Sequence, residues 1–225
     1  WRLDNTDASF ANWSYNVLFN TGDTIVLRDV ANNKKATTFS YTFADNNNLT
    51  TIGEGLFDAN TEVTDFGSTF ENCKGLTSIP NGLFAGKSKA TNFRTVFFTC
   101  NGITSAIPGD LFDGCTAAES FELAFANCSK LSGNIPETLF EDSPNVKTFS
   151  GLFEGCAGLT GDIPAGLFKN NTKVENFTGT SLPSTGGVGT TLFIIIGSLL
   201  MFEETSISEG KLCEISSFIS SAKTI

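Results

Sequence analysis

The sequence contains no histidine, and among its 225 residues it has only one methionine, two tryptophans and two tyrosines. Without histidine, the side chain used most often for acid–base catalysis and for metal binding is missing. Basic residues are also scarce, because 14 Lys and Arg stand against 24 Asp and Glu, which gives a net charge of −10. This charge argues against binding of nucleic acid or of anionic lipid, both of which need a basic surface.

These absences lead us to expect no enzyme, no cofactor and no metal site. The chain has no phosphate-binding glycine motif and no Cys-x-x-Cys pair. Scattered acidic residues such as Asp110, Asp113, Glu119 and Glu122 are more typical of a solvated face than of a catalytic acid–base pair. Residues 45–48, Asp-Asn-Asn-Asn, lack the spacing of a calcium-binding EF-hand, so we interpret them as a loop.

Phenylalanine, by contrast, is abundant, with 22 copies, and 15 of them fall into three columns when the chain is aligned on itself at a shift of 27 or 28 residues. A coil of this length is too small to close its own core, but stacked coils bury a continuous column at each repeated apolar position. The sequence therefore predicts a leucine-rich-repeat-like solenoid of five repeats, with Phe177 opening a sixth. The columns are Phe39, Phe66, Phe93, Phe121 and Phe149; Phe43, Phe70, Phe97, Phe125 and Phe153; Cys73, Cys100, Cys128 and Cys156; Leu49, Leu76, Ile103, Leu131 and Leu159; Ile52, Ile79, Ile107, Ile135 and Ile163; and the Leu-Phe pairs that end at Phe57, Phe84, Phe112, Phe140 and Phe168.

Within each repeat, the pattern predicts two short parallel strands. One is the Leu-x-x-Ile stretch, such as 76–79, and the other is the stretch that leads to the first Phe, such as 146–149. Four of the five Ile residues are followed by proline, which has no N–H to donate and should end the first strand. The aromatic-to-cysteine stretch, such as 124–128, is expected to form one helical or 3₁₀ turn.

The cysteines follow the repeat and not a disulfide framework. Four of them share one column, where a small thiol can pack inward and donate weakly to a backbone carbonyl. Asn46 occupies that column in the first repeat. Neighbouring coils also bring Cα atoms to about 5 Å, which a disulfide tolerates, so bridges within the column stay open as an alternative. Cys115 is placed off the column on a corner, and Cys213 lies in the tail.

The regions on either side of the repeats divide the chain further. Residues 1–38 lack the columns but contain an apolar run at 24–27, so we interpret them as an N-terminal cap or a degenerate repeat; a truncated larger protein would look the same. Because the chain starts at Trp1 without a charged-then-apolar leader, we expect a mature form or a fragment. The repeat domain is assigned to 39–180.

The Phe-x-x-Cys-x-x-Leu pattern followed by Ile-Pro, as in 125–131 and 135–136, resembles the BspA-like leucine-rich repeats of bacterial surface proteins. The likeness covers roughly residues 39–180. It implies an extracellular solenoid that serves adhesion or binds host proteins. A fold-level likeness names no ligand.

Residues 181–187 contain Leu182, Pro183, Ser184, Thr185 and Gly186, which are similar to the LPxTG sorting signal of Gram-positive surface proteins. That resemblance implies that a sortase recognises Leu182 and Pro183, attacks the carbonyl of Thr185, releases the chain from Gly186 onward and transfers the rest to a peptidoglycan or pilin amine. The expected location is therefore extracellular and cell-wall anchored.

An apolar segment at 188–202 follows the motif, as a sorting signal requires, and it is expected to insert transiently into the membrane. Its apolar part of about 15 residues is shorter than the roughly 20 that span a bilayer. It is followed by Glu203 and Glu204, where a Lys/Arg cluster is expected. We therefore interpret 203–225 as an atypical polar tail and hypothesise that the residues after about Met201 are out of frame or belong to a degraded gene, which resequencing would test.

The remaining candidate for recognition is the solvent side of the Leu-x-x-Ile stretches. Small polar side chains there would form a flat face that could dock a protein or a glycan, or could be tolerated surface. Two functions stay open: a wall-anchored adhesin or binding scaffold, and a structural spacer or pilus-type subunit without a specific ligand. The candidate face comprises Thr50, Thr77, Ser78, Thr104, Ser105, Ser132, Asn134, Thr160 and Asp162.

Overall fold

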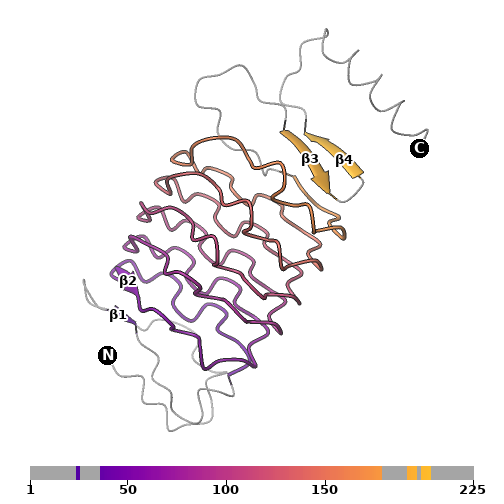
Figure 1. Cartoon of the computed structure of the whole chain (residues 1–225). Coiled ribbons are helices and arrows are strands. Elements are labelled where there is room, and N and C mark those ends of the chain that lie inside the picture. The colour runs from indigo at the N-terminus through magenta and orange to yellow at the C-terminus, as the bar shows by residue number, and fades with distance from the viewer. Residues whose placement is uncertain (1–23, 26–35, 179–191, 197–198, 204–225) are drawn as a thin grey trace, which may run out of the picture.

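Hydrogen bonds between backbone groups 26 to 29 positions apart join the chain into successive coils between residues 36 and 178. The computed structural model describes residues 24–25, 36–178, 192–196 and 199–203. Figure 1 shows the coils one above another, from indigo at the N-terminal end to orange at the C-terminal end. The spacing of these bonds is the spacing of the Phe columns, so each coil corresponds to one sequence unit.

Regular secondary structure makes up little of the described chain. Strand β1 (Thr24–Ile25) pairs in parallel with β2 (Thr51–Ile52), with Thr24 opposite Thr51. Strands β3 (Leu192–Ile196) and β4 (Leu199–Glu203) pair antiparallel, with Leu192 opposite Glu203. The described residues contain no helix, and turns fill most of the coils. All isolated parallel bridges but one run through a single column, formed by Thr38, Asp65, Asn92, Ser120, Thr148 and Asn176; the other joins Gly133 and Leu159.

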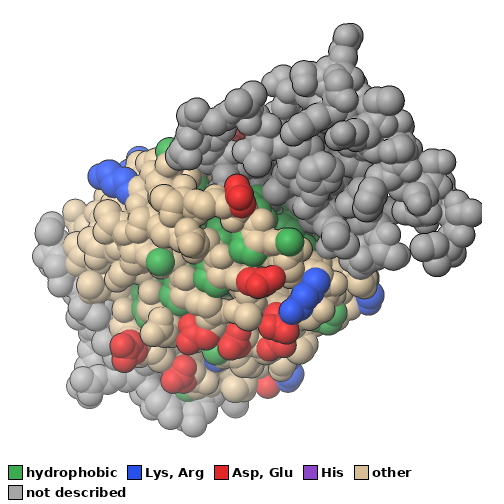
Figure 2. All heavy atoms as spheres, turned by 45° about the horizontal axis from the view of Figure 1, so that its top comes forward, with side chains coloured by type: hydrophobic (Ala, Val, Ile, Leu, Met, Phe, Trp, Pro, Cys, Tyr) green, Lys and Arg blue, Asp and Glu red, His purple; other side chains and the backbone are tan. Residues whose placement is uncertain are grey.

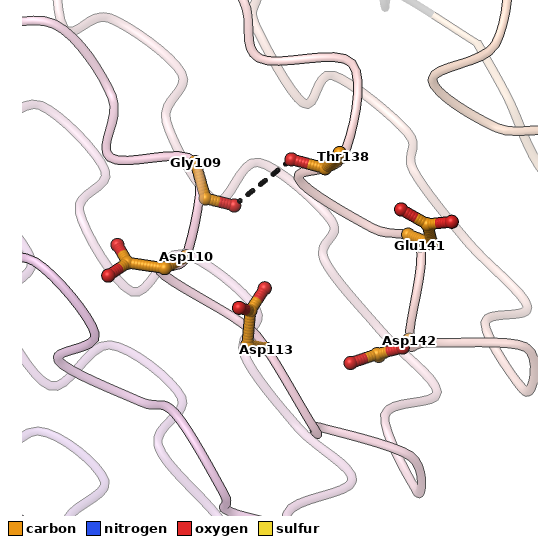
Figure 3. Close-up of a pocket in the computed structure, with 6 residues that line it drawn as sticks. All are labelled: Gly109, Asp110, Asp113, Thr138, Glu141 and Asp142. Carbon is orange, nitrogen blue, oxygen red and sulfur yellow. Dashed lines mark hydrogen bonds between the residues drawn. The ribbon is translucent and has the colours of Figure 1, made fainter.

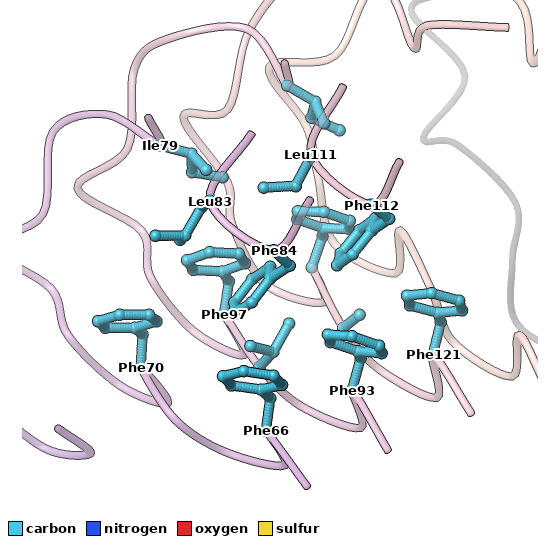
Figure 4. Close-up of a cluster of buried hydrophobic side chains, with 14 of the residues drawn as sticks. Phe66, Phe70, Ile79, Leu83, Phe84, Phe93, Phe97, Leu111, Phe112 and Phe121 are labelled. Atoms are coloured by element: carbon cyan, nitrogen blue, oxygen red, sulfur yellow. The ribbon is translucent and has the colours of Figure 1, made fainter. Parts of the chain in front are cut away.

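Phenylalanine rings fill the interior of the coils (Figure 4). Like columns stack nearly in parallel: the rings of Phe66 and Phe93 have centroids 5.6 Å apart at an interplanar angle of 10°. Unlike columns meet edge to face, as Phe84 and Phe93 do at 5.3 Å and 68°. Each such aromatic pair adds about 0.5–1.5 kcal/mol beyond the area that it buries. The repeated Phe is therefore both the sequence signal and the main packing contact between coils.

The predicted inward columns are confirmed by their burial. Every Phe of the three columns, and every Cys and Leu column member, is buried. The Ile column is also buried except at the last coil, where Ile163 and the nearby Val174 are only partly buried. Both side chains belong to the last of the five repeats, so the burial of the core is least complete there.

The expected helical or 3₁₀ turn is wrong. In the segment 93–100, three overlapping turns follow one another, in which Val96, Phe98 and Cys100 donate their N–H groups to carbonyls three residues back. Between these turns, Thr95 and Thr99 have φ values of 52° and 61°, in the left-handed region. A helix needs right-handed backbone throughout, so this alternation excludes it.

The reason for the alternation is the bonding between coils. Every second N–H group of the same segment is directed out of its own coil: Phe93 donates to the carbonyl of Ser120, and Thr95 to that of Glu122. In a helix these groups would all be satisfied within the segment. Equivalent φ values recur in the other coils at Tyr41, Asp45, Ser68, Asn72, Leu123, Asn127, Gly151 and Gly155.

The Leu-x-x-Ile stretches form less sheet than expected. One backbone bond crosses most boundaries here, such as the N–H of Thr104 to the carbonyl of Thr77 at 3.0 Å. Only β2 qualifies as a strand at this position, because β1 supplies it with a partner. In four of the five repeats, the Ile that closes this stretch is followed by proline. Proline has no N–H group to donate, so the ladder between neighbouring coils is limited to a single backbone bond.

The two sides of a coil donate in opposite directions. On the Phe-to-Cys side, the N–H groups of Phe66, Ser68 and Phe70 all donate toward the following coil. On the Leu-x-x-Ile side and just before each first Phe, the N–H groups of Thr77 and Thr91 donate toward the preceding coil. Each coil therefore has a defined polarity along the stack.

Residues 188–202, which the sequence assigns to an apolar membrane segment, are described in part as β3 and β4. In the described part of the chain, no helix is both long and apolar enough to cross a membrane. Of the predicted N-terminal cap, β1 and the residues from Ala36 onward are described; the rest of 1–35 lies outside the described residues.

Candidate functional site

The cysteine column is a ladder of thiols that bond to backbone, as the sequence predicted. The Sγ atoms of Cys73, Cys100, Cys128 and Cys156 each donate to the carbonyl of a Phe in the preceding coil, at 2.9–3.0 Å. All five cysteines of the described residues are free thiols, so the disulfide alternative is not realised there. Burial raises the pKa of the Cys73 and Cys156 thiols to about 12. These thiols are structural and are not nucleophiles at neutral pH.

Cys115 lies off the main cysteine column, as the sequence placed it, and it is fully buried. It lies in a second buried polar column, where its Sγ donates to the carbonyl of Phe84 at 3.2 Å. In the two coils that follow, Ser143 Oγ donates to the carbonyl of Cys115, and Asn171 Nδ2 donates to that of Ser143. The column was missed because its members differ in chemistry. They are Asn60, Lys87, Cys115, Ser143 and Asn171, all buried.

Lys87 is the charged member of this column. Desolvation lowers the pKa of its amine, while the carboxylate of Asp58, one coil earlier, acts in the opposite direction. Its long apolar stem is buried in the column, as the side chains of Cys115 and Ser143 are in other coils. We assign Lys87 a packing role.

The predicted face of small polar residues is solvent-accessible, since none of its nine members is buried. Three of its hydroxyl groups donate to a neighbouring coil: Thr77 Oγ1 donates to the carbonyl of Thr50 at 3.2 Å, and Ser132 Oγ to that of Thr104 at 2.6 Å. Thr160 Oγ1 donates to Asn134 Oδ1 at 3.1 Å. These bonds cross coil boundaries, so they hold the side chains of the face in register.

A second surface feature, which the sequence did not predict as a unit, is an acidic hollow at the Leu-Phe corners of two coils (Figure 3). Its volume is about 370 Å³. Two of the carboxylates are held by backbone N–H groups: Gly82 donates to Asp110 at 3.0 Å, and Gly114 donates to Asp142 at 2.9 Å. The lining residues are Gly109, Asp110, Asp113, Thr138, Glu141 and Asp142.

Asp113 is the carboxylate most affected by this arrangement. Desolvation raises its pKa, and the neighbouring carboxylates of Asp142, Asp110 and Glu141 raise it further. The sequence placed Asp110 and Asp113 on a solvated face, and both are exposed. What it missed is that Glu141 and Asp142 of the next coil join them. The signal that could have found this cluster is the shared phase of Asp113 and Glu141, each directly after a Leu-Phe pair.

The other two acidic residues that the sequence singled out lie in ion pairs. Glu119 pairs with Lys147 at 2.8 Å and Glu122 with Arg94 at 3.4 Å; the Glu122 side chain is partly buried and the other three are about half exposed. Asp45 accepts a hydrogen bond from Asn72, and Asn46 donates to the carbonyl of Phe43, so the 45–48 loop is structural. On the face shown in Figure 2, acidic side chains gather and few basic ones lie among them. Within the described residues, no group of His, Cys, Asp or Glu is arranged to hold a metal ion.

The sorting motif, Leu182, Pro183, Ser184, Thr185 and Gly186, lies outside the described residues, as does Cys213. The described residues thus present two candidate surfaces, the polar face and the acidic hollow. No protein-family model matches the chain, and no curated protein sequence matches it.

Proposed function

We propose that this chain is a cell-wall-anchored surface protein with BspA-like leucine-rich repeats, which displays a rigid polar face to a protein or glycan ligand and catalyses no reaction. The observation that carries this proposal is the predicted face itself. Its small side chains are accessible and aligned from coil to coil by hydrogen bonds such as that of Thr77 to Thr50. A surface whose side chains are already fixed loses little conformational entropy on binding.

The Phe columns support the leucine-rich-repeat assignment, because a solenoid buries one column per repeated apolar position. The parallel bridges of the column that contains Asp65 and Asn92 fit a repeat strand reduced to one residue. Anchoring is proposed from the sequence alone: a sortase would cleave after Thr185 and join the chain to a peptidoglycan or pilin amine, after transient insertion of 188–202.

Binding can be tested with the full chain on a glycan array and on immobilised extracellular-matrix glycoproteins. Arg substitutions at Thr77 and Thr104 would place two bulky charges on the face. Ser88→Arg is the matched control, because Ser88 is exposed but lies outside the face. We expect the face variants to lose at least about tenfold in affinity, or about 1.4 kcal/mol, while the control binds normally. If the Thr77→Arg, Thr104→Arg and Ser88→Arg variants bound equally well, the proposed role of the polar face in binding would be rejected.

The alternative function is a structural spacer or a pilus-type subunit without a ligand. The acidic, ion-paired surface favours solubility and would serve such a spacer equally well. Ladders of covalent multimers in cell-wall extracts would favour this alternative. The intact mass of the wall-released protein tests the anchoring step common to both, because cleavage should leave Thr185 as the last residue.

A further inference from the structure

We propose that the stack of coils is an extensible element, which lengthens one coil at a time when a force pulls the two ends of the chain apart. Its use as a tether rests on the proposed function, since a surface protein that is anchored and engaged by a ligand carries load. The mechanical behaviour rests on the bonding between coils and needs no ligand.

The bonds between coils run along the direction in which the coils are stacked. At the boundary between two coils, the N–H of Asn72 donates to the carbonyl of Phe98 at 2.7 Å, and the N–H of Thr91 donates to that of Thr64 at 2.9 Å. The first and last described coils lie at opposite ends of the stack (Figure 1). Force on the chain ends is therefore carried by the boundaries in series, so that they can open one at a time without shearing together.

Side-chain packing is equally local. The ring of Phe93 meets Phe66 and Phe84 of the preceding coil. It also meets Phe112 of its own coil and Phe121 of the next. Among the described residues, the ring contacts join only the same coil or adjacent coils. Loss of a terminal coil thus exposes one face of its neighbour but removes no contact from the coils beyond it.

Apart from the peptide backbone, no disulfide joins one described coil to another. The thiols that cross the boundaries, such as Cys100 and Cys128, are free and form only hydrogen bonds to carbonyls. The backbone between the bridge positions Ser120 and Thr148 comprises one coil. Fully extended, a coil of that size spans roughly 90–100 Å, whereas it occupies about 5 Å of the stack. Each coil that detaches thus lengthens its part of the protein about twentyfold.

The test is single-molecule force spectroscopy of the full chain held by its two ends. We expect a series of separate force peaks, with equal contour-length increments of roughly 90–100 Å. Release of the whole stack in a single larger step would overturn the proposal, as would extension without any resisting peak. Neither outcome bears on ligand binding, so failure here is distinguishable from failure of the proposed function.

A lock on one boundary supplies a matched control. Ser68 Oγ and Thr95 Oγ1 face each other from neighbouring coils at 2.7 Å, so the double variant Ser68→Cys/Thr95→Cys can form a disulfide there. The oxidised protein should lose one increment and shorten in total extension by roughly 90 Å, because the residues between the two positions are withheld. The same molecules after reduction should recover it. An unchanged pattern in a protein that mass spectrometry shows to be oxidised would contradict stepwise detachment.

Discussion

The Sγ of Cys100 donates a hydrogen bond of 2.9 Å to the carbonyl oxygen of Phe70, one coil earlier. This bond places a thiol where it satisfies an inward carbonyl without adding bulk between the Phe columns. The same relationship recurs at three other boundaries, and it defines how the protein should respond to thiol reagents and to high pH.

Native protein should be inert to thiol reagents. In a Cys213→Ser variant, the five remaining cysteines are all buried, and iodoacetamide at pH 8 should modify none of them within an hour. In denaturant, mass spectrometry should show five modifications. Rapid labelling of the folded variant at Cys73 or Cys156 would contradict the interior placement.

Alkaline pH should destabilise the protein through the same thiols. Burial raises the pKa of Cys115 from 9.0 to about 12. Between those values the unfolded chain has released a proton that the folded chain retains, so stability is full below pH 9 and falls as the pH rises toward 12. Within that pH range, each such thiol lowers the free energy of unfolding by about 1.4 kcal/mol for every pH unit of increase. Urea unfolding between pH 8 and 11 should show a shallower decline for Cys115→Ala than for the unsubstituted protein.

Two adjacent phenylalanines should differ sharply in their contribution to stability. Phe97 is fully buried between the rings of Phe70 and Phe125, whereas its neighbour Phe98 is partly exposed. Phe97→Ala should lower the free energy of unfolding by about 3–5 kcal/mol. Phe98→Ala should cost about 1 kcal/mol or less. Similar losses from both changes, measured by urea unfolding, would contradict the inward columns.

Thr99 is strained and should be improved by substitution. Its φ of 61° disfavours a β-branched residue, and the equivalent positions hold Asp45, Asn72, Asn127 and Gly155, which tolerate the left-handed region better. Thr99→Asn should stabilise the fold by about 1 kcal/mol, seen as a rise in Tm of about 2–4 °C. The reciprocal change, Asn127→Thr, should lower Tm by a similar amount. A calorimetric result with the signs reversed would refute the turn geometry.

Removing the charge of Asp113 should stabilise the acidic hollow at neutral pH. The pKa of this carboxyl is raised in the folded protein, so the folded state disfavours its ionisation above the unfolded pKa near 4. Asp113→Asn should therefore raise Tm at pH 7 by about 1–2 °C and have no effect at pH 3. Asp142→Ala is the contrast, because it removes the acceptor of the Gly114 N–H and should lower Tm.

The burial pattern of the core could be predicted from the sequence because one residue type repeats at each interior position. Phe66, Phe93 and Phe121 are chemically identical, so their phase is visible without a structure. The column of Lys87, Cys115 and Ser143 is just as regular in space, but burial there is compatible with several chemistries, and no single residue type marks it.

The turns could not be predicted, for a different reason. Tyr41, Thr95 and Leu123 are poor choices for positive φ, yet the bonds to the next coil impose it. The preference of these residues for negative φ is overridden because every second N–H group of the segment is bonded to a carbonyl of the next coil. The acidic hollow escaped notice because Asp113 and Asp142 belong to different repeats, in which their positions are otherwise filled by residues of mixed type.

The opposite donation of the Phe-to-Cys and Leu-x-x-Ile sides fixes how the gene can change in length. One coil can follow another only in the same orientation and with equivalent residues aligned. In any other arrangement, backbone N–H groups of one coil would face N–H groups of the next and not carbonyl groups. Duplication or deletion of one whole unit meets this condition, because Phe66 could pair with Ser120 as it does with Asn92. Unequal recombination between repeats would thus yield longer or shorter proteins that remain foldable, whereas indels of arbitrary size would not.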